Sequence, residues 1–270
     1  MDPMLKLSGV YTAMVTPFHD NKTQGVDYHT LEECVHRQLD ARIDGLLFLG
    51  STGEAITLSA RERKEIIKQG VRLSRGSASV MVGTGSSDTK EAVKLTKEAA
   101  SLDANFVLVS APAYNKPSQE GIYQHFVQVA QHGGVPIVVY NVPSRTGVNI
   151  ETSTLERIAG LDNVVGVKEA SGNMGQIGDV LYRFKGRSFS VLSGDDSLTL
   201  PLLSMGGHGV ISVISNILPE DMVQLVEAWG DRDLDGASDQ HHYLHPMMQA
   251  SFLEGNPASV KTMMELAGYC

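Results

Sequence analysis

Residues 164–172 read VVGVKEASG, and the prediction of the fold starts from this stretch. The apolar run 164–167 is typical of a strand buried on both faces of a parallel sheet, yet it ends on Lys168 instead of a turn residue. Burial disfavours the charged form of an ammonium group, which leaves a nucleophilic amine near neutral pH. Lys168 is therefore a candidate for forming a Schiff base. The alternative is a strand-end lysine whose charged group extends into water.

Seven further short apolar runs lie along the chain, and amphipathic helical patterns separate them, for example over residues 31–39 and 222–229. This alternation predicts an α/β protein with a closed (β/α)8 barrel, the TIM barrel; a doubly wound open sheet is the alternative. The barrel is favoured because no glycine-rich dinucleotide fingerprint follows the first strand. The expected strands cover residues 10–15, 45–49, 80–82, 106–109, 137–140, 164–167, 189–192 and 210–213.

Capping patterns mark several helix starts. Ser59 with Glu62, and Ser153 with Glu156, match the capping box in which a hydroxyl and a carboxylate satisfy the first backbone N–H groups. The sequence therefore predicts helices that begin directly after Ser59 and Ser153.

The pattern changes after Trp229, where a polar stretch and then an amphipathic one follow. We expect residues 1–229 to form the catalytic barrel and residues 230–270 a short C-terminal helical region. His241 and His245 lie four positions apart there, but a solvated helix is preferred over a metal site because no third ligand is evident. Residues 206–209, GGHG, lack the lysine and hydroxyl of a phosphate loop and are expected to pack tightly before the last strand.

The composition excludes several classes of partner. A formal net charge of -9 argues against nucleic acid and against an anionic membrane, and no apolar run approaches the roughly 18 residues of a membrane span. The two cysteines, Cys34 and Cys270, have no metal-ligand spacing and predict neither zinc nor a disulfide framework. Without a secretion signal in the sequence, a cytoplasmic location is expected.

In such a barrel the active site lies at the C-terminal ends of the strands, so the residues that follow each apolar run meet at one mouth. Backbone N–H groups of residues 50–53 can cradle a carboxylate there. The hydroxyl of Tyr140 needs a hydrogen-bonding partner, and Arg145 can bind a carboxylate through two parallel hydrogen bonds.

Three stretches carry a family resemblance: GSTGE at 50–54, YNVPSRT at 140–146 and GVKEASG at 166–172. Together they resemble the dihydrodipicolinate synthase branch of the pyruvate-dependent Schiff-base aldolases and lyases, over about residues 9 to 261. The resemblance implies condensation of pyruvate with L-aspartate 4-semialdehyde to 4-hydroxy-tetrahydrodipicolinate, in the diaminopimelate route of lysine biosynthesis. It implies no metal and no organic cofactor.

The resemblance also implies catalytic roles. Lys168 would form the imine with pyruvate, Tyr140 would carry protons to and from it, and Ser51 and Tyr114 would complete a hydroxyl relay. In this family the tyrosine at position 114 reaches into a neighbouring subunit, so the resemblance implies a homo-oligomer, a tetramer built as a dimer of dimers.

Substrate contacts follow from the same resemblance. Thr52 would bind the pyruvate carboxylate, Arg145 would orient the aldehyde, and backbone around Gly194 and Ile211 would line the lysine pocket. Ser51 stands where this branch commonly has threonine and the related N-acetylneuraminate lyases commonly have serine, whereas Arg145 favours the synthase branch. Family members usually continue for another helix or two beyond the position of Cys270, so the C-terminal region is expected to be shorter than theirs.

Two other functions are weighed against the synthase. A sister lyase would act on a 2-keto-3-deoxy or sialic sugar acid, and a catalytically silent paralogue would serve as a scaffold or ligand sensor. Several synthases of this family are inhibited by lysine at a dimer interface. The corresponding positions here hold Ala60, Arg63 and Ala113, and Glu91 is left as the one expected partner for an amine. The enzyme is therefore expected to be insensitive to lysine.

Overall fold

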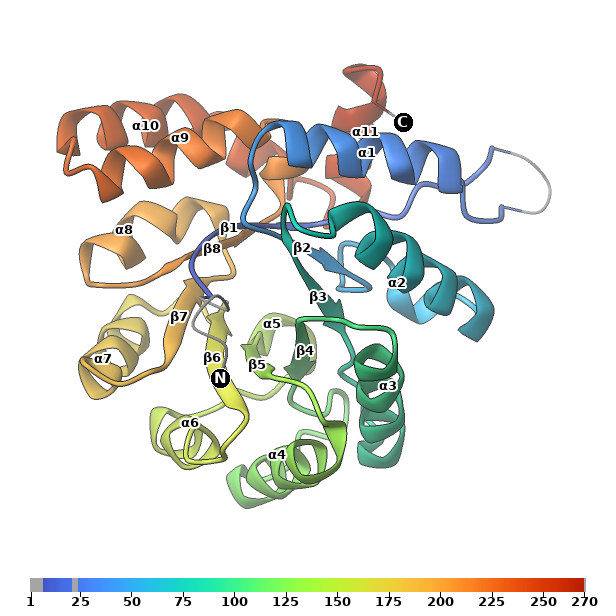
Figure 1. Ribbon diagram of the computed structural model, residues 1–270. Helices are drawn as coiled ribbons and strands as arrows, with labels where there is room; N and C mark the ends of the chain where they lie inside the picture. The colour runs from blue at the N-terminus through green and yellow to red at the C-terminus, as the bar shows by residue number, and fades with distance from the viewer. Residues whose placement is uncertain (1–6, 21–23, 270) are drawn as a thin grey trace.

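The computed structural model describes residues 7–20 and 24–269, and its centre is a closed barrel of parallel strands (Figure 1). Each strand pairs with its neighbour in the chain, and the last pairs with the first, as Gly9 with Gly209. The predicted (β/α)8 barrel is confirmed. The strands are β1 Gly9–Ala13, β2 Gly45–Phe48, β3 Ser79–Gly83, β4 Phe106–Ser110, β5 Ile137–Asn141, β6 Val164–Glu169, β7 Ser190–Ser193 and β8 Gly209–Ser212.

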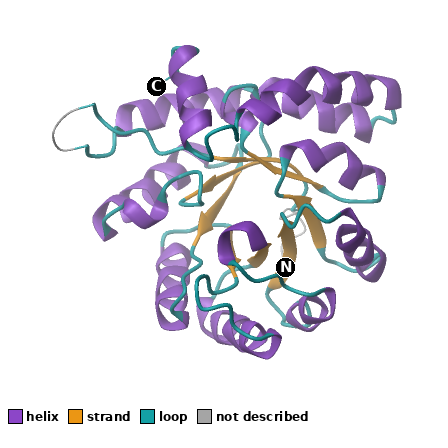
Figure 2. Cartoon of the chain, turned by 180° about the vertical axis from the view of Figure 1, so that it is seen from behind, coloured by secondary structure: helices purple, strands orange, loops and turns teal. Residues whose placement is uncertain are grey.

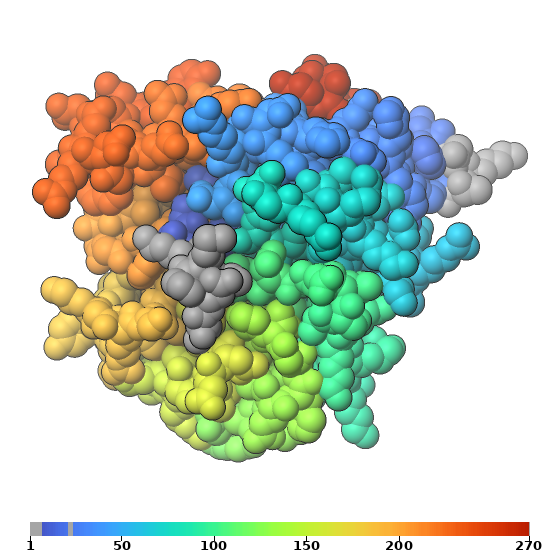
Figure 3. All heavy atoms as spheres, viewed as in Figure 1, coloured from blue at the N-terminus to red at the C-terminus, as the bar shows by residue number. Residues whose placement is uncertain are grey.

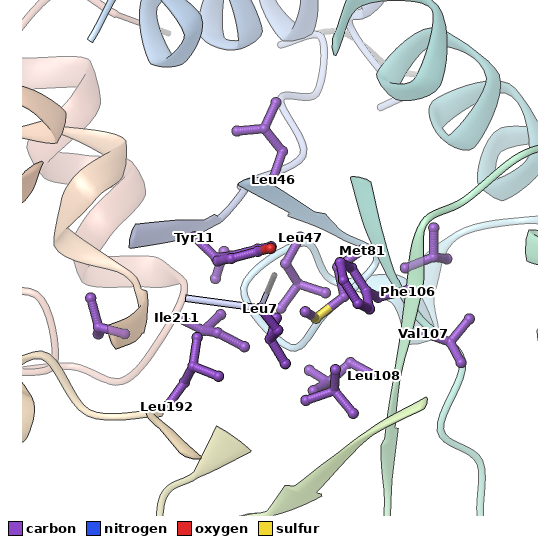
Figure 4. Close-up of a cluster of buried hydrophobic side chains, with 14 of the residues drawn as sticks. Leu7, Tyr11, Leu46, Leu47, Met81, Phe106, Val107, Leu108, Leu192 and Ile211 are labelled. Carbon is purple, nitrogen blue, oxygen red and sulfur yellow. The ribbon is translucent and has the colours of Figure 1, made fainter. Parts of the chain in front are cut away.

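The barrel interior is a packed core and not a channel (Figure 4). Every residue of β2 and of β8 is buried, which explains why the strands are continuous apolar runs without alternation. Tyr11 and Phe106 meet edge to face across the interior with ring centroids 6.5 Å apart. This packed core supports the residues at the strand ends from below.

Helices surround the barrel on its outside. The short α5 lies over the end of the barrel that faces the viewer in the reverse view (Figure 2). The α-helices are α1 Tyr28–Asp40, α2 Ala60–Ser74, α3 Thr89–Ser101, α4 Gln119–Gly133, α5 Pro143–Thr146, α6 Thr152–Ile158, α7 Met174–Phe184, α8 Thr199–Ser204, α9 Pro219–Gly230, α10 Leu234–Ala250 and α11 Ala258–Leu266. Short 3-10 turns are η1 Ala55–Thr57, η2 Asp196–Leu198 and η3 Ile214–Asn216.

One predicted helix start is confirmed and the other is wrong. Ser59 caps α2, since its hydroxyl accepts from the backbone N–H of Glu62 while the Glu62 carboxylate accepts from the N–H of Ser59 at 2.8 Å. At the second position, Glu151 caps α6 instead of Ser153. The helix begins two residues earlier than expected, and the Glu151 side chain makes no capping hydrogen bond, while its backbone N–H donates to the side chain of Gln119 at 3.1 Å.

The C-terminal helices pack on one side of the barrel, α10 along α9 and α11 near α1, as the adjoining colours of the space-filling view show (Figure 3). The expected helical appendage is present, whereas a domain boundary at residue 229 stays a prediction. The tight packing expected of residues 206–209 is present at Gly209, where a Cβ would lie 2.0 Å from the carbonyl oxygen of Gly9, but Gly206 is exposed with open space around it. Within residues 7–20 and 24–269, no helix has the length and apolar character needed to cross a membrane.

Candidate active site

A cavity of about 380 Å³ opens at the C-terminal ends of the strands. Six of the predicted site residues line it: Ser51, Thr52, Tyr140, Arg145, Lys168 and Gly194. Most of the predicted site residues therefore lie around this mouth, as expected for residues at strand ends.

Lys168 and Tyr140 lie side by side because β5 and β6 pair them in register. The Lys168 Nζ atom is 4.7 Å from the centroid of the Tyr140 ring, and the lysine is only 4% exposed. Burial lowers the pKa of Lys168 to about 8; the negative charge of Asp196 acts against this shift, and the positive charge of Arg145 adds to it. A lysine with this pKa supplies neutral amine near physiological pH. Because Lys168 is buried, the alternative of a charged group that extends into water is wrong.

Asp196 is a buried carboxylate near this lysine that sequence reasoning did not assign a role. Its Oδ2 atom accepts from the backbone N–H groups of Val213 at 3.0 Å and Ile214 at 3.1 Å, which ties η2 to the end of β8. Burial raises the pKa of the Asp196 carboxyl, and hydrogen bonds from Ser212 and the two N–H groups oppose this rise. Asp196 thus joins two strand ends and contributes negative potential at Lys168.

Gly194 leaves the space that the lysine side chain needs. A Cβ at this position would lie 2.7 Å from the Cβ of Ala170 and 3.0 Å from the Cε of Lys168. The backbone N–H of Gly194 donates to the carbonyl of Glu169 at 2.8 Å, so the close approach is held by the end of β6.

Tyr140 faces the cavity from the end of β5. Burial raises the pKa of its phenol, while the positive charge of Arg145 and hydrogen bonds with Ser51 and Arg145 act in the opposite direction. Ser51 and Arg145 therefore contact a hydroxyl that can exchange protons with a group bound in the cavity.

The turn after β2 places Thr52 in the wall of the cavity, where it is 3% exposed. The Thr16 hydroxyl braces this turn by donating to the carbonyl of Gly53 at 2.7 Å. Asn256 donates from its side-chain nitrogen to the Thr52 hydroxyl oxygen at 2.9 Å, and Phe252 also lines the cavity. Sequence reasoning missed these two C-terminal residues. The Asn-Pro pair before α11 marks Asn256 but not Phe252, and no local pattern places either residue over the mouth.

Two predicted site residues do not line the cavity. Tyr114 is 89% exposed on the loop after β4, with a φ of 75° in the left-handed region that a tyrosine rarely adopts. Ile211 is fully buried in the barrel core, and Val213, just past the end of β8, faces the cavity instead. Within this chain, the site therefore contains neither the Tyr114 hydroxyl nor the Ile211 side chain.

Among the described residues, no three or more histidine, cysteine, aspartate or glutamate side chains are grouped as metal ligands. What the mouth does offer is an amine nucleophile, a phenol beside it, and hydroxyl and guanidinium groups that can bind carboxylates. A parallel barrel with this set of groups is typical of aldolase-type lyases.

The chain belongs to the dihydrodipicolinate synthetase family, whose family model matches residues 6–270. A 4-hydroxy-tetrahydrodipicolinate synthase of Syntrophus aciditrophicus is 45% identical over 96% of this chain and 88% of its own length. The crystal structure of dihydrodipicolinate synthase from Aquifex aeolicus is 41% identical, with a TM-score of 0.93 over 97% of this chain and 89% of that one. A structure described as a monomeric dihydrodipicolinate synthase variant is 42% identical, with a TM-score of 0.94 over 97% and 87% of the two chains.

These likenesses confirm the family expected from the three sequence stretches. The chain is accordingly a lyase, and its activity is 4-hydroxy-tetrahydrodipicolinate synthesis. The silent-paralogue alternative lacks support, since the lysine, the tyrosine and the carboxylate-binding groups are all in place.

Proposed function

We propose that this activity proceeds through an imine between pyruvate and Lys168, and that the enamine formed from it attacks L-aspartate 4-semialdehyde. The observation that carries the proposal is the buried amine of Lys168, with its pKa lowered to about 8, beside the Tyr140 ring. The covalent imine takes the place of a metal or organic cofactor. A cytoplasmic setting belongs to the proposal and rests on the sequence.

The chemistry follows from the groups around the cavity. The neutral Lys168 amine attacks the ketone carbon of pyruvate, and water leaves as the protonated imine forms. This imine withdraws electrons from the methyl carbon. Tyr140, which gave its hydroxyl proton to the departing water, takes a proton from that carbon and produces the enamine. The enamine carbon then bonds to the aldehyde carbon, whose oxygen receives a proton. Attack of the substrate's own amine on the imine carbon closes the ring and releases Lys168.

Binding roles are assigned by charge and position. Thr52 is placed to donate a hydrogen bond to the pyruvate carboxylate, and Arg145, exposed at the mouth, to bind the carboxylate of the second substrate. Gly194 supplies room for Lys168, and the backbone after Ile211 supplies Val213 to the cavity wall. Ser51 and Tyr114 are assigned to a hydroxyl relay, Tyr114 from a neighbouring subunit.

Borohydride reduction in the presence of pyruvate tests the proposal directly. Reduction should add the mass of one reduced pyruvate to the peptide that contains Lys168 and leave exposed lysines such as Lys116 unlabelled. A label elsewhere, or no label with saturating pyruvate, would overturn the imine mechanism. Turnover of a sugar acid in preference to L-aspartate 4-semialdehyde would favour the sister lyase.

For Arg145→Ala we expect impaired use of the aldehyde with imine formation largely retained. The lost contact is a charge-assisted hydrogen bond, worth about 1.5–3 kcal/mol, or about one to two decades in kcat/KM for L-aspartate 4-semialdehyde. Steady-state kinetics with each substrate varied in turn, together with borohydride trapping, separate the two effects. An equal fall in trapping would place Arg145 in the pyruvate site instead.

Tyr114 is proposed to act across a subunit boundary in a homotetramer built as a dimer of dimers. Its exposure and left-handed backbone support this, since an exposed aromatic side chain on a strained residue needs another reason for its position. Mixing inactive Tyr114→Phe subunits with inactive Lys168→Arg subunits should restore activity as hybrids form. If exchange is confirmed by mass and activity stays at the sum of the separate variants, the relay does not cross the boundary.

We further expect the enzyme to be insensitive to millimolar L-lysine. The Arg63 guanidinium donates to the carbonyl of Ala55 at 3.2 Å, and the Glu91 carboxylate already pairs with Lys94 at 3.1 Å. Ala60 offers no side-chain hydrogen bond, and each lost contact weakens binding by about 0.5–1.5 kcal/mol. Initial rates with added L-lysine check this; half-maximal inhibition below about a millimolar, a Kd worth about 4 kcal/mol, would contradict it.

A further inference from the structure

The segment that joins α10 to α11 forms part of the cavity wall and is fixed to the turn after β2. Phe252 and Asn256 line the cavity from this segment. Further along, Lys261 on α11 donates to the Glu54 carboxylate at 2.7 Å and to the carbonyl of Thr16 at 3.0 Å. The segment is therefore held at fixed distance from the turn that carries Thr52.

The contact between Asn256 and Thr52 has a definite polarity. The Asn256 Nδ2 group donates to Thr52 Oγ1 at 2.9 Å, so one lone pair of the hydroxyl oxygen is occupied. A hydroxyl has a single hydrogen, and an ionised carboxylate can only accept hydrogen bonds. Because the amide does not claim that hydrogen, the Thr52 hydroxyl is free to donate into the cavity.

We propose that Asn256 is a positioning residue that orients the Thr52 hydroxyl so that its hydrogen is available to a substrate carboxylate. This inference rests on the proposed role of Thr52 in binding pyruvate. The backbone carbonyl of Asn256 also lies 3.5 Å from an Arg145 side-chain nitrogen, so the same residue contacts the groups assigned to both substrates.

Aspartate at position 256 would reverse the polarity with almost no change in shape. The amide oxygen of Asn256 is buried and has no hydrogen-bond donor among the described residues. A carboxylate there would have the Thr52 hydroxyl as its nearest donor, and it would take the hydrogen that the substrate needs. Alanine, in contrast, would remove the positioning contact and leave the hydroxyl hydrogen free.

The two roles open to Asn256 predict opposite orders of severity for the aspartate and alanine variants. If it only fills space, the isosteric Asn256→Asp should retain more function than Asn256→Ala. If it orients Thr52, Asn256→Asp should raise the KM for pyruvate by about ten- to a hundredfold, and Asn256→Ala by about two- to tenfold. The concentration of pyruvate that gives half-maximal borohydride trapping should shift in the same order. Thermal midpoints of both variants report whether the fold is intact.

The Thr52→Val background separates the orienting effect from simple charge repulsion. If Asn256→Asp acts through the hydroxyl, its additional effect on pyruvate binding should shrink severalfold when Thr52 is already valine, because interacting residues are non-additive. An unchanged effect in that background, or a ranking with aspartate milder than alanine, would overturn the inference. Wild-type protein that traps no pyruvate would overturn the proposed function itself, so the two failures are distinguishable.

Discussion

Replacing Lys168 with arginine should abolish pyruvate trapping and lower kcat/KM by at least about three decades, the scale expected when an essential nucleophile is lost. A guanidinium stays protonated at any pH that the fold tolerates, so it has no free amine with which to form the imine. Borohydride trapping with mass analysis and steady-state rates measure both effects.

Lys185→Arg is the matched control for this variant, because Lys185 is exposed and lies outside the cavity. It should keep wild-type rates and wild-type labelling. Substantial activity in Lys168→Arg, with a normal thermal midpoint, would contradict the role of Lys168 as nucleophile.

The lowered pKa of Lys168 adds a pH dependence to the same step. The group is nucleophilic only when neutral, so the rate of imine formation should rise with pH and level off above the folded pKa of about 8. At pH 7 about one-tenth of the molecules would carry the neutral amine. A trapping rate that rises instead only toward pH 10.5, the ordinary lysine value, would show that burial does not tune this amine.

Tyr140→Phe has the second largest expected effect, a fall in kcat of about two to four decades, which is the usual contribution of a positioned proton-transfer group. The aromatic ring and its packing against Lys168 stay, while the hydroxyl that exchanges protons is removed. Pyruvate should still be trapped on Lys168 after long incubation. Exchange of the pyruvate methyl protons with deuterated solvent, followed by NMR, reports the missing step.

Tyr182→Phe controls for loss of a phenol in general, since Tyr182 is exposed on α7 and does not line the cavity. It should leave exchange and turnover unchanged. If Tyr140→Phe exchanged methyl protons at the wild-type rate, another group would have to be the base.

Much of this architecture could be predicted from the sequence because its strands are buried on both faces and therefore appear as continuous apolar runs. Lys168 stood out for the same reason, as a charged residue that ends such a run. Once eight strand ends were identified, barrel geometry alone placed Ser51, Tyr140 and Gly194 at one mouth.

What could not be predicted depends on contacts between distant segments. The helix α6 begins before its capping box, at a point where Gln119 of α4 accepts a hydrogen bond from the backbone N–H of Glu151. Asp196 reaches the backbone at the end of β8, and Asn256 reaches Thr52, through tertiary packing that no local pattern encodes. Ile211 differs in another way: it is part of the core, and the strand's continuation to Val213 brings a side chain to the cavity.

The contact from Asn256 to Thr52 spans 204 positions of the chain, and Lys261 reaches Thr16 across 245. A large loop must close before such contacts contribute stability, and the same holds for the pairing of Gly9 with Gly209 that closes the barrel. The last strand, β8, ends at Ser212, so a growing chain contains every barrel strand before the segment that carries Asn256 is made. The barrel can therefore close before the active site is able to work, because the pocket is complete only after the final helix docks.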